Sequence, residues 1–200
     1  MLYVTITGVD GSGKSTLVHA LERQLTKQGK QVCVVREPGG CPTAEAIRAV
    51  LKTQSLQPST DALLMAAARA ELMFTTVIPA LQADKIVLSD RSVACSCVYQ
   101  GYVAGLGIPQ VWELNVDYGL HGHVPSVEFF LDTPLELVRK RMKSRNQVDR
   151  FELHEGERIR AGYLEFYRLG KYPHVHLKPG ATISETLSTV LQSLKPYMDD

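Results

Sequence analysis

The sequence lacks a long apolar run, a strong net charge and a cysteine framework. No uninterrupted apolar stretch reaches about 18 residues, the length that suggests a membrane-spanning helix. A net charge of +1 provides no general attraction to nucleic acid or to an anionic membrane. The four cysteines have neither disulfide-framework nor zinc-site spacing. We therefore expect no membrane and no nucleic-acid partner, and cysteines that act as small apolar residues.

The composition is that of an ordinary globular protein. Hydrophobic residues make up 44% and charged residues 22% of the 200 positions. No repeat, low-complexity run or long linker interrupts the chain, so we expect one domain over residues 1–200. The first expected strand begins at Leu2, which leaves no room for a secretion signal. A cytoplasmic location is the expectation that follows.

The most informative stretch is residues 8–15, which matches G-x-x-x-x-G-K-[ST], the P-loop that surrounds nucleotide phosphates. An apolar, β-branched run precedes it, and helical spacing follows it. Its glycines allow backbone N–H groups to approach phosphate oxygens. Lys14 can then reach the β- and γ-phosphates, and the Ser15 hydroxyl can ligate Mg²⁺. The expected nucleotide site comprises Gly8, Val9, Asp10, Gly11, Ser12, Gly13, Lys14, Ser15 and Thr16.

Strand-like and helical patterns alternate along the chain. Strands are expected at 2–7, 31–36, 85–89, 126–131 and 173–177. Helices are expected at 14–28, 43–52, 60–83, 92–105, 109–118, 134–144, 155–169 and 183–194, with Pro79 kinking the third or marking its last turns. The alternation predicts an α/β fold with a parallel sheet. In such sheets, ligands bind at the carboxyl ends of the strands.

Polar motifs follow two of these strands. Residues 36–40, Arg-Glu-Pro-Gly-Gly, suit a rigid turn that aims Arg36 into the cleft, although an ordinary turn with a solvated arginine is the alternative. Asp90 ends the third apolar strand, the position that serves Mg²⁺ in P-loop enzymes, and Arg91 beside it can hold a second phosphate. A purely structural Asp90 that caps the next helix is the competing reading.

A third cluster is strongly cationic. It contains Arg139, Lys140, Arg141, Lys143, Arg145 and Arg150. A solvated helix face is the usual explanation of such a run. Here the run leads into Asn146-Gln147-Val148, so we expect a small lid over about 141–153 that carries arginines to a phosphoryl-transfer site.

In order and spacing, these motifs resemble the thymidylate kinase family over nearly the whole chain. The resemblance also covers residues 67–69 (Ala-Ala-Arg), 99–101 (Tyr-Gln-Gly) and 149–152 (Asp-Arg-Phe-Glu). Gly11 stands where some members have an arginine, and the lid supplies the cations instead, as in the bacterial type. The resemblance implies the P-loop NTPase fold, with a five-stranded parallel sheet, helices on both faces and a small lid. It also implies ATP-dependent, Mg²⁺-requiring phosphorylation of dTMP to dTDP.

Residue roles follow from the resemblance. Asp10 would contact the 3′-hydroxyl of dTMP, Arg36 and Arg91 its phosphate, Arg69 a base carbonyl, and Tyr99 the deoxyribose. The implied substrate site is Asp10, Arg36, Pro38, Met65, Arg69, Arg91, Ser96, Tyr99 and Gln100. The implied catalytic residues are Lys14, Asp90, Arg145 and Arg150, and Ser15 and Asp90 would serve the metal.

A homodimer is also implied, because subunits of this family pair through helices. The expected 60–83 helix has more apolar residues than one core-facing stripe requires, namely Leu63, Leu64, Leu72, Met73, Phe74, Val77 and Ile78.

Two departures from the family pattern leave other functions open. Met65 stands where a phenylalanine usually stacks on thymine, and the region of Ser96 and Cys97 differs where the base is read. A broader deoxynucleoside-monophosphate kinase that accepts dUMP or other bases is therefore an alternative. A non-catalytic ATP-binding regulatory protein is another, although lid arginines have no purpose in a pure binder.

Overall fold

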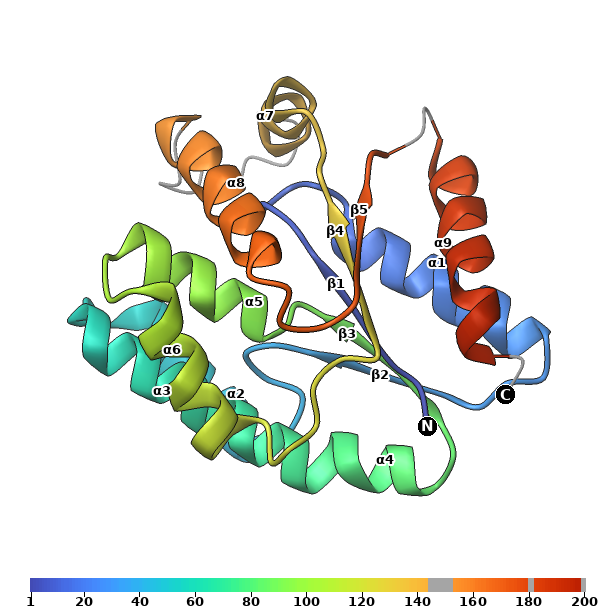
Figure 1. The fold of residues 1–200 in the computed structure, drawn as a ribbon, viewed down its shortest axis with the longest axis horizontal. Helices are drawn as coiled ribbons and strands as arrows, with labels where there is room; N and C mark the ends of the chain where they lie inside the picture. Colours follow the sequence, from blue (N-terminus) through green and yellow to red (C-terminus); the bar gives the residue numbers. More distant parts are fainter. Residues whose placement is uncertain (144–152, 180–181, 199–200) are drawn as a thin grey trace.

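Five parallel strands form the central sheet of this computed structural model, which describes residues 1–143, 153–179 and 182–198 (Figure 1). The strands are β1 (Tyr3–Thr7), β2 (Val32–Arg36), β3 (Ile86–Asp90), β4 (Val127–Leu131) and β5 (His174–Leu177). Their order is β2-β3-β1-β4-β5. The expected five-stranded parallel sheet is thus confirmed, and β1, which leads into the P-loop, lies at its centre.

Helices cover both faces of the sheet (Figure 1). On one face, α1 (Lys14–Lys27) and α9 (Ile183–Met198) pack together. The other elements, in chain order, are α2 (Pro42–Thr53), α3 (Pro58–Leu72), η1 (Met73–Val77), α4 (Ile78–Gln82), α5 (Val93–Ser96), η2 (Cys97–Val103), α6 (Ile108–Leu114), η3 (Asn115–Gly119), α7 (Leu135–Lys143) and α8 (Leu153–Arg168).

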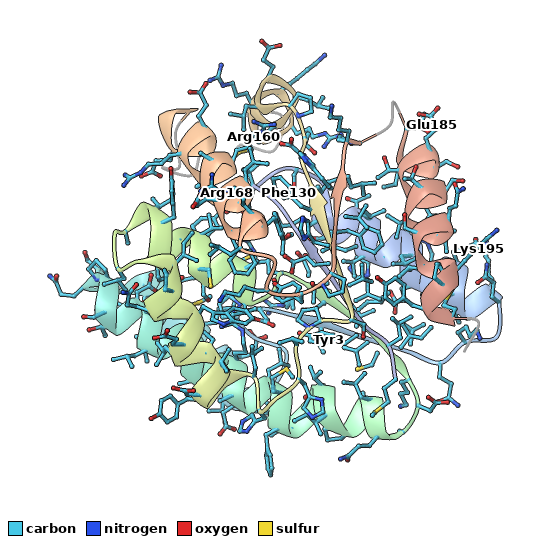
Figure 2. All side chains as sticks on the ribbon, viewed as in Figure 1. Tyr3, Phe130, Arg160, Arg168, Glu185 and Lys195 are labelled. Carbon is cyan, nitrogen blue, oxygen red and sulfur yellow. The ribbon has the colours of Figure 1, made fainter. Side chains whose placement is uncertain are left out.

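Strand periodicity separates the two faces of the core, because successive side chains point to opposite sides of a sheet. Val4, Ile6 and Phe129 pack with α1 and α9. On the other face, Phe130 stacks on Tyr163 of α8 with ring centroids 4.9 Å apart. Figure 2 shows Phe130 of β4 beside α8, whereas Glu185 projects from the outer side of α9.

Three helical stretches contain π-helical turns where the sequence patterns predict plain helices. Before Pro79, the Ile78 N–H donates to the Met73 carbonyl, five residues back. Proline lacks an N–H and crowds the preceding turn, so a π turn accommodates it within a helical stretch from Pro58 to Gln82. Further π segments, η2 and η3, lie within the helices expected at 92–105 and 109–118. The helical periodicity of the sequence is present in all three stretches. Whether a backbone N–H bonds four or five residues back is a local detail that this periodicity does not predict.

The Pro58–Gln82 stretch also has the length and mean hydropathy, 1.4, of a membrane span. It nevertheless buries Arg69, Leu72 and Val77 inside the protein. A core helix of a globular protein meets the same criterion of length and composition.

Candidate active site at the carboxyl edge of the sheet

The P-loop connects β1 to α1 against the end of β4. Gly8 has a φ of 144°, and a Cβ there would lie 2.6 Å from the Leu131 carbonyl oxygen, so no larger residue fits. Lys14 is only 5% exposed. Its Nζ donates to the Val9 carbonyl at 2.8 Å and lies 3.7 Å from Asp10 Oδ1. The ammonium is therefore held against the loop that surrounds the phosphates in proteins with this motif.

Burial perturbs the Lys14 ammonium. Desolvation, followed by the nearby Arg91 charge, lowers its pKa to about 8, against the opposing effects of Asp10 and Asp90. The lowered pKa means that the protein stabilises the charged ammonium less than water does. Phosphate oxygens would restore that stabilisation, so the site favours binding of a polyanion.

The Ser15 hydroxyl donates to Asp90 Oδ2 at 2.5 Å, which brings together the two residues expected to serve the metal. Asp90 Oδ1 is buried and has no hydrogen-bond partner among the described residues. A buried carboxylate oxygen without a donor suits a cation or its bound water. The described part of the chain contains no cluster of three or more His, Cys, Asp or Glu side chains able to hold a metal. With an adjacent hydroxyl and a buried carboxylate oxygen that has no donor among the described residues, Ser15 and Asp90 fit Mg²⁺, which binds through one or two carboxylates, phosphates and water.

Arg91 joins the P-loop to the neighbouring pocket. Its φ of 83° is sparsely populated by non-glycine residues, and the Ser89 hydroxyl and the Ile6 carbonyl hold its backbone. Its guanidinium pairs with Asp10 and lies 5.8 Å from the centre of the Tyr99 ring. Burial would raise the Asp10 pKa, but the charges of Arg91 and Lys14 outweigh it and lower the pKa. Asp10 therefore carries its negative charge between two cations.

A cavity of about 240 Å³ opens beside Arg91. Its lining residues are Pro38, Arg48, Leu51, Lys52, Met65, Arg91, Cys95, Tyr99 and Gln100. Five of these (Pro38, Met65, Arg91, Tyr99 and Gln100) come from four segments of the sequence and belong to the substrate site expected above. The structure therefore brings most of that site together in one hollow.

Arg69, by contrast, lies buried outside the lining of this cavity. Its Nε donates to Glu37 at 2.6 Å and its Nη1 to Asn115, while Nη2 donates to the Ser92 carbonyl and, at 3.1 Å, to Ser96 Oγ. The small residues around Arg69 on α3 favour, taken alone, simple helix packing with an exposed arginine, and the burial of Arg69 contradicts that expectation. The Ser96 hydroxyl is likewise committed to Arg69.

Arg36 is directed to Glu45 rather than into the cavity. Its Nη2 donates to both Glu45 oxygens, at 2.8 and 2.9 Å, and the Gly40 N–H donates to the same carboxylate at 2.7 Å. The backbone bond from Gly40, followed by the charge of Arg36, lowers the Glu45 pKa. The expected rigid turn is thus present, and Glu45 of α2 closes it.

A second cavity, of about 220 Å³, borders the P-loop itself. It is lined by Gly11, Ser12, Gly13, Thr16, Leu17, Leu131, Arg141, Pro179, Thr182, Ile183 and Thr186. Arg141 of α7 donates to the Ser12 carbonyl at 2.8 Å and so covers part of the loop. One hollow therefore borders the phosphate-binding loop, and the other borders Arg91, which pairs with Asp10 of that loop.

A family model described as thymidylate kinase matches residues 6–183. The chain belongs to the thymidylate kinase family. It is 35% identical to the thymidylate kinase of Geobacillus thermodenitrificans, over 96% of this chain and 91% of that protein. The thymidylate kinase of Thermoanaerobacter sp. is 38% identical over 98% of both chains. A crystal structure of thymidylate kinase from Ehrlichia chaffeensis superimposes with a TM-score of 0.78 at 25% identity, covering 97% of this chain and 98% of that one. The expected family and P-loop NTPase fold are confirmed.

Sequence reasoning missed several residues of this family member's two cavities. Arg48 lines the first cavity and donates to the Pro38 carbonyl at 2.8 Å, and Cys95 lines it as well. Arg48 follows the Arg-Glu-Pro-Gly-Gly turn on α2, so a cation on the helix after that turn was an available signal. Pro179, Thr182 and Thr186 of the second cavity follow β5, where no ligand-binding motif marks them.

Two expected catalytic residues of the lid, Arg145 and Arg150, lie outside the described residues. Of the same cationic cluster, Arg139 and Arg141 are described, and Arg141 contacts the P-loop. The roles of Arg145 and Arg150 stay predictions.

Proposed function

We propose that the protein transfers the γ-phosphoryl group of ATP to the phosphate of dTMP, giving ADP and dTDP. A phosphate oxygen of dTMP forms the new bond to the γ-phosphorus, and the bond to the β-phosphate oxygen of ATP breaks. One observation carries this proposal: the P-loop cation Lys14 and the cavity cation Arg91 both approach Oδ1 of Asp10. A donor phosphate held by Lys14 and an acceptor phosphate held by Arg91 would thus lie side by side.

The two cavities suit the two nucleotides. The cavity beyond Gly11–Gly13 would receive the adenosine of ATP, with Arg141 over the loop. The cavity lined by Arg91 and Arg48 would receive dTMP, with the Tyr99 ring under the sugar. Arg36 would reach the acceptor phosphate by leaving Glu45, which is an exposed pair and therefore weakly held.

We include Mg²⁺ in this proposal, held through Ser15 and Asp90. The ion would neutralise the charge that develops on the transferring phosphoryl group. Ser15 and Asp90 already contact each other, and the second oxygen of Asp90 is buried without a donor among the described residues.

Base recognition is proposed to depend on Arg69 and Gln100. Four of the five N–H donors of the Arg69 guanidinium are bonded to protein groups, and the fifth would serve the O4 carbonyl of thymine if the base reaches past the present lining of the cavity, to which Arg69 does not belong. Gln100 donates to Asp61 at 2.8 Å, and its buried Oε1, without a partner in the described part of the chain, suits the N3–H of thymine. Cytosine offers an amino donor and a bare ring nitrogen at these positions.

Competition among dTMP, dUMP and dCMP at one ATP concentration tests the proposed substrate. We expect kcat/KM to fall in that order, with a larger step from dUMP to dCMP than from dTMP to dUMP. The missing methyl group of dUMP is worth roughly 1–3 kcal/mol at most, whereas a mismatch with buried polar groups costs more. Met65 can also collapse over the space of that methyl group. Equal use of dCMP and dTMP would instead support the broader deoxynucleoside-monophosphate kinase, and absence of ADP release with every monophosphate the regulatory alternative.

Alanine at Arg145 or Arg150 is predicted to lower kcat while changing KM for ATP little. Cations delivered only when a lid closes stabilise the transition state more than the bound nucleotide. Steady-state kinetics at saturating dTMP separates the two parameters. A raised KM for ATP at unchanged kcat would show that these arginines only bind the ground state.

We further propose a homodimer and a cytoplasmic location. Three large apolar side chains are exposed: Phe74 of η1 and Tyr118 of η3, at 70% and 69%, and Leu63 of α3, at 57%. Exposed apolar groups of this kind suit a protein interface. Light scattering at micromolar concentration is expected to give twice the 22.1 kDa of one chain, and a mass of one chain would reject the dimer.

A further inference from the structure

Glu128 is a fully buried carboxylate in the middle of β4, with 0% of its surface exposed. It forms no ion pair with any cation in residues 1–143, 153–179 or 182–198. Four hydroxyl groups surround it instead: those of Thr5, Ser92, Tyr167 and Tyr172. Burial raises its pKa, and the hydroxyl donors oppose this effect. A buried acid with hydroxyl partners only is costly to keep, so its position calls for a reason.

The directions of these hydrogen bonds are mutually consistent with an acceptor-only carboxylate. Ser92 Oγ donates to Glu128 and accepts the Ala94 N–H at 3.1 Å. Tyr167 donates to Glu128 at 2.5 Å, and its oxygen can accept from Thr7, 2.6 Å away. Because the Glu128 carboxylate only accepts, it fixes the direction in which each neighbouring hydroxyl group donates.

Ser92 connects this acid to the active site. It is the N-cap of α5, and its carbonyl accepts from Arg69 at 3.3 Å. It directly follows Arg91, whose φ of 83° needs support from its neighbours. On its other side, α5 and η2 carry Cys95, Tyr99 and Gln100 into the cavity.

We propose that Glu128 is a positioning residue for the acceptor site: through Ser92 it holds the Asp90–Arg91 turn and the start of α5 in place. This inference rests on the proposed function. Glu128 lines neither the cavity beside Arg91 nor the one at the P-loop, so it acts through Ser92 and not on substrate. The P-loop itself has separate anchors, such as the bond from Thr133 to the Ser12 carbonyl.

The test compares Glu128→Gln and Ser92→Ala with Tyr167→Phe. Glutamine is a neutral and therefore weaker acceptor than the carboxylate, and its amide group must donate on one side, so the bond that holds the Ser92 hydroxyl is weakened. We expect kcat/KM for dTMP to fall about tenfold in Glu128→Gln and in Ser92→Ala, because small displacements of positioning groups are costly. KM for ATP should stay within about twofold. Tyr167→Phe removes a hydroxyl donor from the same carboxylate but leaves Ser92 bonded, and should retain kcat/KM for dTMP within about twofold.

Two further variants separate positioning from general destabilisation. The Glu128→Gln/Ser92→Ala double variant should be no slower than either single variant, because both break one connection. Ser92→Thr, which retains the hydroxyl, should restore most of the kcat/KM that Ser92→Ala loses. Equal losses for dTMP and ATP, equal losses in Tyr167→Phe, or additive losses in the double variant would each overturn the proposal. Wild-type turnover of dTMP is measured first, and its absence would refute the proposed function instead.

Discussion

Replacing Lys14 with alanine is expected to lower kcat by about a thousandfold or more. Phosphoryl transfer depends on positioning and on charge stabilisation, and Lys14 is the only cationic side chain within the P-loop motif. The ammonium is buried, so water cannot replace it effectively.

A coupled assay of ADP release from ATP with dTMP measures this loss. Lys27→Ala is the matched control, because Lys27 is exposed at the end of the same helix, α1. We expect the control to retain wild-type turnover. Activity of Lys14→Ala within threefold of wild type would exclude the P-loop as the catalytic site.

The same residue predicts a pH dependence in the wild-type protein. The Lys14 pKa of about 8 means that the free protein carries the ammonium charge below that pH and loses it above. Since kcat/KM reports groups of the free enzyme, kcat/KM for ATP should decline above about pH 8. Bound phosphates raise the pKa of the ammonium, so kcat should decline only at higher pH. A profile of kcat/KM that is flat to pH 9.5 would contradict this assignment.

Replacing Arg69 with methionine is expected to lower the free energy of unfolding by about 3–5 kcal/mol. The Arg69 and Glu37 side chains are 1% and 3% exposed and 2.6 Å apart. Without the guanidinium, the Asn115 carbonyl oxygen loses its buried donor, and the Glu37 carboxylate keeps only the long bond from the Tyr3 hydroxyl, at 3.5 Å. An uncompensated buried charge is costly, which makes this the largest single-site loss of stability that we predict.

Reversible urea denaturation of both proteins gives the difference. The Arg69→Met/Glu37→Gln double variant is the control, because it removes the charge that the single variant leaves unpaired. It should recover part of the lost stability. If Arg69→Met costs under about 1 kcal/mol, the pair contributes no more than an exposed one, and the buried network is not organised as described.

The sequence by itself determined the parts of this protein that depend on local pattern. The P-loop, the five strands and the helical stretches follow from spacing within short segments, and the structure contains them near the expected residues. The proposed nucleotide and metal site is equally local in the sequence, because residues 8–15 are consecutive and Asp90 ends a strand at the sheet edge where ligands bind in such folds. Family membership follows from the order and spacing of these short motifs along the chain.

Only the tertiary structure decided which side chains meet. Arg69 on its helix pattern looks exposed, yet Glu37 and Asn115, 32 and 46 residues away, bury it. Arg36 is held by Glu45, and Arg48 lines the cavity. Both follow from the position of α2 against the rest of the fold, which the sequence of α2 does not reveal. In the sequence, Glu128 is an ordinary polar residue of a strand. In the fold, the hydroxyl groups of Thr5, Ser92 and Tyr167 donate to it and bury it. Such partners are selected by the low dielectric of the core, where an unpaired charge or dipole is expensive, and only the packed chain defines that core.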